Sequence, residues 1–157
     1  MEKDDVKKYF KKCNELLTND GIVITIVPAS MKYWEIEDEI AGHVKRYEFS
    51  DFKDLADKFN YDINKINGLT FPISNLLLPI SNHLVTKSES WKKNLDLQER
   101  TKLSSSGGAR NVPGKTTFPK IFKYLLNEIT MYPFYLLQII FSKSKRSMII
   151  YCELKKR

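Results

Sequence analysis

The chain has 157 residues, of which 42% are hydrophobic and 12% aromatic, and this composition excludes an intrinsically disordered protein. The net charge of +7 is uneven, because residues 84–157 hold 15 basic and 5 acidic side chains, whereas residues 1–83 hold 11 and 14. A basic half can face nucleic acid, anionic lipid or an acidic substrate, or it can be a solvated lysine-rich surface. It carries no nucleic-acid-reading motif, so we expect no nucleic-acid partner.

The N-terminal residues and the apolar segments of the chain predict its cellular compartment. Residues 1–5 are charged and lack the apolar core of a signal peptide. The longest apolar run, at 131–141, is about half of the roughly 20 residues that a membrane span needs. The sequence therefore predicts a cytoplasmic protein without a transmembrane segment. Cys13 and Cys152 match no zinc or redox spacing and predict two reduced core thiols.

Hydrophobic periodicity predicts a helix, a tight turn and a buried strand in the first part of the chain. The helix covers residues 4–17, with Asp4 as its N-cap and the apolar side chains on one face. Gly21, at the end of the turn, is free to adopt positive φ. Residues 22–27 are a continuous β-branched run, which is typical of a strand buried on both faces of a parallel sheet. Pro28 ends this strand.

The rest of the chain alternates apolar periodic segments with proline and polar breaks. In order we expect a helix that Ser50 caps and that runs to about Phe59, and a weaker strand at 61–69. Pro72 and Pro79 then break the chain into short helical pieces up to Val85, and a flexible insertion or lid covers 86–117. A third helix begins at Phe118, Pro133 kinks or restarts it, and a terminal strand covers 148–154.

Polar residues gather directly after the first predicted strand. We expect this segment, up to Tyr47, to be a loop at the carboxyl end of the strand, where open α/β sheets place their ligand chemistry. Its elements are Val27-Pro28-Ala29, Asp38-Glu39, Gly42-His43 and Lys45-Arg46-Tyr47.

This order of residues, preceded by Gly21, resembles the second half of class I S-adenosylmethionine-dependent methyltransferases. The resemblance implies an α/β chain with a partial Rossmann-like methyltransferase fold, made of strands five to seven with flanking helices and a helical insertion. The last strand would run antiparallel between the other two. Residues 1–157 would be a single C-terminal half-domain that contributes the acceptor-substrate side of the active site.

The donor half of the family has no counterpart in the sequence. The family's glycine-rich turn follows a strand, whereas Gly107-Gly108 lies in a polar segment with no strand before it. S-adenosylmethionine is therefore implied for the complete enzyme, and we expect no cofactor-binding residue and no binding of the cofactor by this chain alone. A missing N-terminal half, or self-association through the exposed edge of the strand at 22–27, would complete the sheet.

His43 is the candidate catalytic residue, since histidine titrates near neutrality and a general base helps when a hydroxyl or amine accepts the methyl group. Its alternative role is a hydrogen bond that holds the loop on the sheet. The other histidine, His83, lies in an apolar stretch and is expected to be structural. The substrate-binding candidates are Pro28, Tyr33, Asp38, Arg46 and Tyr47. No metal site is expected.

Several of these candidates have a structural alternative. Asp38 and Glu39 orient a polar acceptor or form an ion pair with Arg46. Arg46 and Tyr47 grip a phosphate or carboxylate, or Tyr47 instead packs where the loop enters the next helix. For the whole chain, the alternative to a methyltransferase fragment that acts on a small-molecule or lipid- or sugar-linked acceptor is a non-catalytic basic module that binds an anionic partner or surface.

Overall fold

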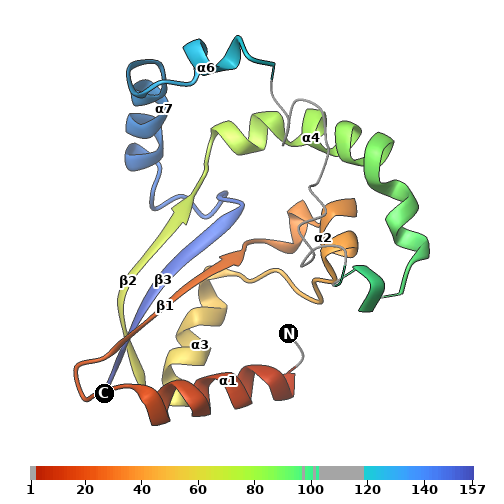
Figure 1. The fold of residues 1–157 in the computed structure, drawn as a ribbon. Coiled ribbons are helices and arrows are strands. Elements are labelled where there is room, and N and C mark those ends of the chain that lie inside the picture. Colours follow the sequence, from red (N-terminus) through yellow and green to blue (C-terminus); the bar gives the residue numbers. More distant parts are fainter. Residues whose placement is uncertain (1–2, 97, 101, 103–118) are drawn as a thin grey trace.

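The structure, a computed structural model, describes residues 3–96, 98–100, 102 and 119–157. They form a three-stranded antiparallel sheet with flanking helices, an α/β arrangement (Figure 1). In chain order the elements are α1 (Lys3–Leu16), β1 (Ile22–Pro28), the 3-10 helix η1 (Met31–Tyr33), α2 (Ile36–Ala41), α3 (Phe49–Phe59), β2 (Tyr61–Leu69), α4 (Ile73–Glu89), the 3-10 helix η2 (Ser90–Asn94), α6 (Phe122–Leu125), α7 (Glu128–Ile140) and β3 (Ile149–Lys156). None of the helices in the described ranges has the length and apolar character needed to cross a bilayer.

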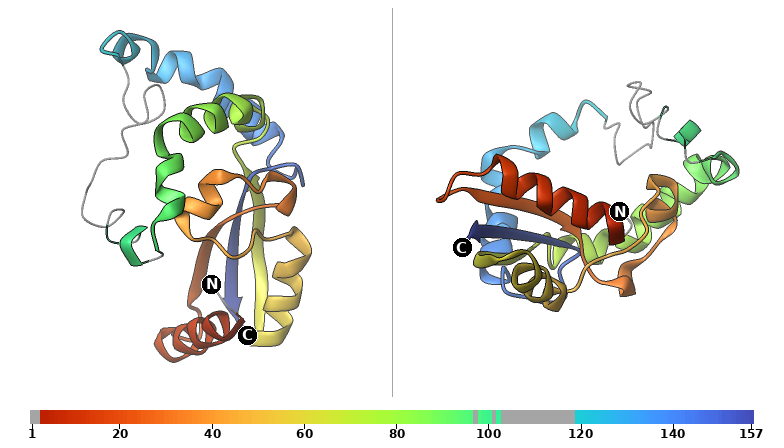
Figure 2. Two further views of the ribbon diagram at one scale, coloured as in Figure 1. Left: turned by 90° about the vertical axis from the view of Figure 1, so that its right-hand side faces the viewer. Right: turned by 90° about the horizontal axis from the view of Figure 1, so that it is seen from below.

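The last strand lies in the middle of the sheet. The strand order is β1-β3-β2, and β3 pairs antiparallel with both neighbours, so β1 and β2 run parallel to each other on either side of it. The expectation that the terminal strand inserts antiparallel between the other two is confirmed. The carboxyl ends of β1 and β2 therefore point to the same end of the sheet, where α4, α6 and α7 gather, while α1 lies at the opposite end (Figure 2).

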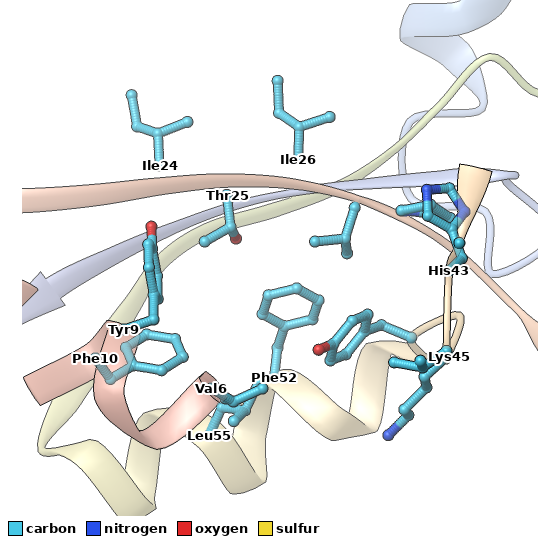
Figure 3. Close-up of a pocket in the computed structure, with 15 residues that line it drawn as sticks. Val6, Tyr9, Phe10, Ile24, Thr25, Ile26, His43, Lys45, Phe52 and Leu55 are labelled. Carbon is cyan, nitrogen blue, oxygen red and sulfur yellow. The ribbon is translucent and has the colours of Figure 1, made fainter. Parts of the chain in front are cut away.

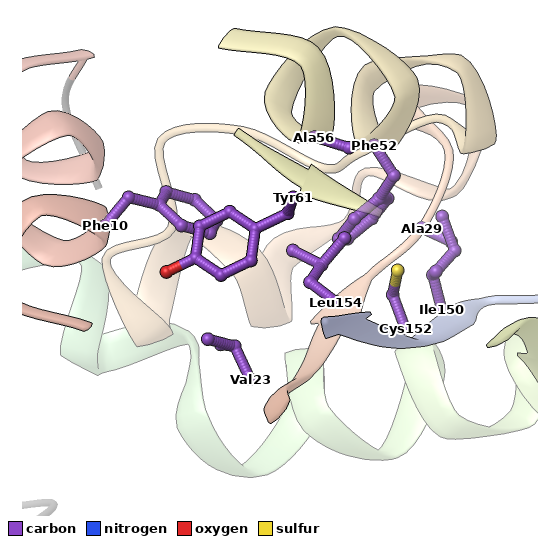
Figure 4. Packing of buried hydrophobic residues seen from close by; sticks show 9 residues of the cluster. All are labelled: Phe10, Val23, Ala29, Phe52, Ala56, Tyr61, Ile150, Cys152 and Leu154. Carbon is purple, nitrogen blue, oxygen red and sulfur yellow. The ribbon is translucent and has the colours of Figure 1, made fainter. Parts of the chain in front are cut away.

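One face of the sheet carries the core. Helix α1 contributes Phe10 to this core and α3 contributes Phe52, and both side chains pack on the inward residues of the strands (Figure 4). The rings of Phe10 and Phe59 are stacked with their centroids 4.7 Å apart. Cys152 is buried in this cluster and Cys13 is half-buried at its edge, and both are free thiols, as the sequence predicts.

The prediction that the first strand is buried on both faces is wrong. Val23 faces the core and is buried, but Ile24 is 58% exposed and Ile26 62%, because β1 is an edge strand that alternates between the core and solvent. Gly21 before it does not have positive φ. A Cβ at this position would lie 2.9 Å from Cβ of Leu17 and 3.0 Å from the carbonyl oxygen of Thr18, so this close turn favours glycine.

Helices α1 and α3 begin at other residues than the sequence predicts. Asp4 lies inside the first turn of α1 rather than at its N-cap. Helix α3 begins before Ser50, because Glu48 is its N-cap and forms a reciprocal capping box with Asp51. A pair of acids thus takes the place of the serine cap that the sequence predicts.

The prolines do not divide the later helices as predicted. Pro79 lies inside α4, which is one helix rather than several short pieces, and Pro133 lies inside α7. The break in the third helical segment comes earlier, at Asn127. Its side-chain oxygen accepts hydrogen bonds from the amides of Ile129 at 3.0 Å and Thr130 at 3.1 Å, and so caps a new helix.

The predicted flexible insertion at 86–117 is wrong at its beginning. Residues 86–89 continue α4 and residues 90–94 form η2, so this part of the segment is helical. The remainder falls largely on 103–118, which lie outside the described residues.

The two edges of the sheet differ in their chemistry. Strand β2 carries Asp62, Asn64 and Lys65, and charged side chains on an edge oppose pairing with another chain. Strand β1 is uncharged and exposes isoleucines, and among the described strands only β3 pairs with it. The β1 edge is therefore the exposed strand that favours association.

We predict that the chain self-associates through β1 and that Ile24→Lys weakens this association. Because Ile24 is mostly exposed, the lysine should change the free energy of unfolding by less than about 0.5 kcal/mol. Sedimentation velocity over a concentration series measures the shift toward monomer. The control is Val44→Lys, which adds a lysine at a residue that is 55% exposed outside the sheet. A wild-type chain that stays monomeric at high concentration contradicts the prediction.

Candidate functional site

A cavity of about 450 Å³ lies between β1, α1 and α3. Phe10, Phe52 and Leu55 form part of its apolar wall, and the segment that follows α2 forms its rim with His43 and Lys45 (Figure 3). An apolar cavity with a few polar groups at one side is the usual form of a small-molecule site.

Asp38 is the centre of the polar network beside this rim. Its side chain is 1% exposed, and Oδ1 lies 2.9 Å from Nδ1 of His43. Arg46 donates from Nε to Oδ1 at 3.1 Å and to Oδ2 at 3.0 Å, and its Nη2 lies 2.9 Å from Oδ2. The amide of Glu35 donates to Oδ2 at 3.0 Å. One buried carboxylate thus binds two side chains and the start of α2.

The local sequence accounts for this placement. Glu35 and Asp38 form the capping box of α2, which fixes the Asp38 carboxylate at the helix N-terminus. Gly42 ends the helix in the left-handed region with φ 70°, which a glycine adopts without strain. The amide of His43 then donates to the carbonyl of Asp38 at 2.9 Å. The expected loop is therefore not all loop, since η1 and α2 lie within it.

Backbone hydrogen bonds hold the segment against the end of β1. The amide of Tyr47 donates to the carbonyl of Pro28 at 2.9 Å, and the amide of Ser30 donates to the carbonyl of Tyr47 at 2.9 Å. Arg46 Nη1 adds a bond of 3.2 Å to the carbonyl of Ala29. The predicted position of this segment, at the carboxyl end of the first strand, is confirmed.

Asp38 stays ionised in spite of its burial. Burial alone raises the pKa of a carboxyl group, but hydrogen bonds from Arg46 and His43, and from the amide of Glu35, outweigh it and hold the pKa of Asp38 below its usual value. The carboxylate therefore remains a hydrogen-bond acceptor at neutral pH.

The contact with Asp38 fixes the orientation of the His43 ring. Because an ionised carboxylate only accepts hydrogen bonds, Nδ1 of His43 is the protonated nitrogen that donates to Asp38. In the neutral imidazole the lone pair is then on Nε2. The side chain is 41% exposed, and His43 is one of the residues that line the cavity. A buried carboxylate that orients an imidazole is one arrangement in which a histidine can act as a general base.

Arg46 and Tyr47 have different surroundings. Arg46 is buried, and its Nε, Nη1 and Nη2 atoms are engaged by Asp38 and Ala29, so its contacts hold the segment together. Tyr47 lines the cavity, as does Pro28. Of this pair, only Tyr47 reaches the cavity.

Other sequence candidates lie away from the cavity. The Tyr33 hydroxyl donates to the carbonyl of Arg146 at 3.1 Å, and Tyr33 does not line the cavity. The Glu39 carboxylate lies 2.6 Å from Nζ of Lys93. His83 is exposed on α4, and not in the apolar environment that its neighbours in the sequence predict.

The contribution of α1 and α3 to the cavity is not predicted by the sequence. Tyr9, Phe10, Phe52 and Leu55 have the spacing of apolar helix faces, and nothing in that spacing distinguishes a cavity wall from core. Lys45 is a further rim residue, with Nζ 5.0 Å from the ring centroid of Tyr47. Its place in the sequence, between the Gly-His and Arg-Tyr pairs, is the signal from which Lys45 could have been predicted as a site residue.

The described residues do not form a site for the cofactor that the sequence resemblance implies. β1 is followed by Ala29-Ser30 and β2 by Thr70-Phe71, so neither strand leads into a glycine-rich turn. Gly107-Gly108 lies outside the described residues. Within the described ranges no group of three or more His, Cys, Asp and Glu side chains is arranged to hold a metal ion.

No protein-family model, curated protein or solved structure matches this chain. The functional conclusion therefore depends on the chemistry of the site itself.

We predict that Asp38→Asn lowers the free energy of unfolding by about 3–5 kcal/mol, because it leaves the buried Arg46 guanidinium without its counter-ion. Denaturant titration followed by circular dichroism measures the change. The matched control is Glu39→Gln, which removes a carboxylate from an exposed ion pair on the same helix and should cost about 0–1 kcal/mol. Equal losses in the two variants would contradict the assigned role of Asp38.

The contribution of Asp38 to the free energy of unfolding depends on pH. Its pKa is lower in the folded chain than the value of about 3.9 in an unfolded one, so its contribution is present above that value and is lost as the pH falls through the folded pKa. The stability difference between wild type and Asp38→Asn should therefore narrow as the pH falls below about 4. A stability difference between wild type and Asp38→Asn that becomes larger as the pH falls would contradict this prediction.

Proposed function

We propose that the chain supplies the acceptor side of an S-adenosylmethionine-dependent methyltransferase of class I, with a partial Rossmann-like fold. The observation that carries this proposal is the Asp38–His43 pair at the rim of an apolar cavity, beyond the carboxyl end of β1. The strand order β1-β3-β2, with the last strand antiparallel in the middle, supports it, because strands five, seven and six of the resembled family have this order.

His43 acts as the general base in this proposal. The proposal places a hydroxyl or amine acceptor in the cavity with its reactive group at the rim, beside His43. Nε2 would take the proton that the acceptor hydroxyl or amine loses, and the carboxylate of Asp38 would stabilise the imidazolium that forms. Arg46 is a positioning residue that keeps Asp38 ionised.

The cavity favours an acceptor with an apolar body. Tyr9, Phe10, Phe52 and Leu55 offer aromatic and aliphatic surface, His43 and Lys45 lie at the rim, and the hydroxyl of Thr25 lies on the β1 side (Figure 3). Substrate contacts are proposed for Tyr47 and Pro28, which line the cavity, and not for Tyr33 or Arg46, whose contacts lie elsewhere.

S-adenosylmethionine supplies the methyl group in the resembled family. Since the described residues do not fit this cofactor, we assign its binding to residues outside them or to a second chain. The roles of His43 and Asp38 concern the acceptor alone. The exposed edge of β1 is the edge at which further strands would extend the sheet.

The alternative is a non-catalytic module that binds an anionic partner through its basic half, which the 15 basic residues of 84–157 favour. In that case His43 only ties the segment after α2 to the sheet. The two functions differ in whether loss of the His43 imidazole abolishes a reaction.

We predict that His43→Gln lowers methyl transfer by about 10²–10⁴-fold while leaving the fold intact, because proton removal loses its base. The measurement follows labelled methyl groups from methionine into products in cells that encode the chain. A product that disappears on deletion of the gene identifies the acceptor, and the rate of its formation is compared between variants. His83→Gln, at an exposed histidine on α4, is the matched control and should behave as wild type. The proposal is contradicted if deletion of the gene removes no methylated product, or if His43→Gln keeps full activity.

We also predict that the purified chain alone does not bind S-adenosylmethionine. Isothermal titration calorimetry at submillimolar cofactor should show no saturable heat, because neither β1 nor β2 leads into a glycine-rich turn. A micromolar dissociation constant would show that the chain carries a donor site of its own.

A further inference from the structure

Helices α6 and α7 expose an unusual amount of apolar surface. No residue of either helix is buried. Ile129 is 85% exposed, Ile140 70% and Tyr124 81%, and the only charged residue of α7 is Glu128. A helix that is apolar around its circumference is normally surrounded by other apolar material.

Helix α7 has two apolar faces with different surroundings. Its inner face takes part in lining a groove of about 690 Å³ against α4, through Met131 and Phe134 on α7 and Leu77 on α4. The outer face is opposite. The residues of this outer face follow the three- and four-residue spacing of one helix side and are all exposed: Ile129, Tyr132, Leu136 and Ile140.

The segment around these helices is strongly basic. Residues 119–147 hold five basic side chains and one acidic side chain. Lys120 and Lys123 precede α7, and Lys143, Lys145 and Arg146 follow it, all exposed. Exposed basic side chains therefore lie in the segments directly before and after α7 in the chain.

We propose that the outer face of α7, together with α6, binds the surface of an anionic lipid bilayer. Its apolar side chains would enter the boundary between headgroups and acyl chains, where tyrosine is favoured, and the flanking basic side chains would contact anionic headgroups. Helix α7 has 13 residues and is about 20 Å long, against a hydrocarbon core of about 30 Å, so it lies in the plane of the interface.

Charge favours a bilayer over a second copy of this chain. A symmetric dimer through this face would bring two identical surfaces together, and each has basic side chains at both ends of α7. Like charges across an interface are repulsive, whereas an anionic membrane attracts each added lysine or arginine. This inference does not depend on the proposed chemistry of His43, because the outer face of α7 does not line the cavity beside β1.

The test is co-sedimentation of the full chain with two kinds of vesicle, at protein concentrations below those at which the β1 edge associates. One kind is pure phosphatidylcholine, and in the other about a third of the lipid is phosphatidylserine. We expect at least about tenfold stronger partition to the anionic vesicles, lowered by added salt. The double variant Ile129→Gln with Ile140→Gln should lower that partition by about tenfold or more. Lys145→Gln with Arg146→Gln should lower it on anionic vesicles only.

Two matched controls separate the surface from general effects of substitution. Leu16→Gln changes an apolar residue that is 73% exposed on α1, and Lys7→Gln with Lys8→Gln removes two exposed charges from the same helix. Both should bind vesicles as wild type does, and circular dichroism should show that all variants fold. Equal binding to both vesicle types, or unchanged binding of the two α7-region variants, overturns the proposal. A dimer that dissociates in Ile129→Gln with Ile140→Gln, without vesicle binding, also overturns it and assigns the face to a second copy.

Discussion

The buried Asp38 carboxylate is the interaction on which the site depends. Removing a carboxylate from water is costly unless charge and hydrogen bonds replace the lost solvent, and Arg46, His43 and the amide of Glu35 do so. Each of these contacts also fixes geometry. The Arg46 contact fastens the segment to the end of β1, the Glu35 contact starts α2, and the His43 contact selects one imidazole tautomer. If Asp38 were lost, all three would be released together.

The sheet explains why this network lies where it does. With β3 inserted between β1 and β2, the carboxyl ends of the two outer strands reach the same end of the sheet. The chain leaves β1 there, forms η1 and α2, and returns to pair Tyr47 with the end of β1 before α3 begins. Helices α1 and α3 close the apolar cavity beneath the rim on one side of β1, whereas the isoleucines of β1 point to the other side of the strand (Figure 3). The cavity is thus formed by β1, α1 and α3, and its rim by the segment that follows α2.

Strand positions follow from local sequence where side-chain pattern and turn residues agree. The sequence predicts the strand at 61–69 with the limits that the structure has, and helix α3 ends directly before it at Asn60 with positive φ. The predicted helical limits are wrong where acids rather than serines cap the helix, at Glu48, and where a side-chain cap at Asn127 decides a break that proline was expected to make. Both errors have the same cause: the limits of a helix depend on which side chain caps its backbone amides, and the residue type alone does not show this.

The sequence alone determined which residues share the segment after the first strand, and that this segment lies at the carboxyl end of that strand, because Pro28 ends the strand and the spacing from Asp38 to Tyr47 is short. It also determined that β1 is apolar. Only the tertiary structure decided that Asp38 contacts both His43 and Arg46, that Arg46 is buried rather than open to a ligand, and that alternate residues of β1 face solvent. The physical reason is that the order of apolar and polar residues fixes only the local periodicity of a helix or strand. The burial of a side chain and its contacts depend on which segments, distant in the chain, come to lie on each face of the sheet.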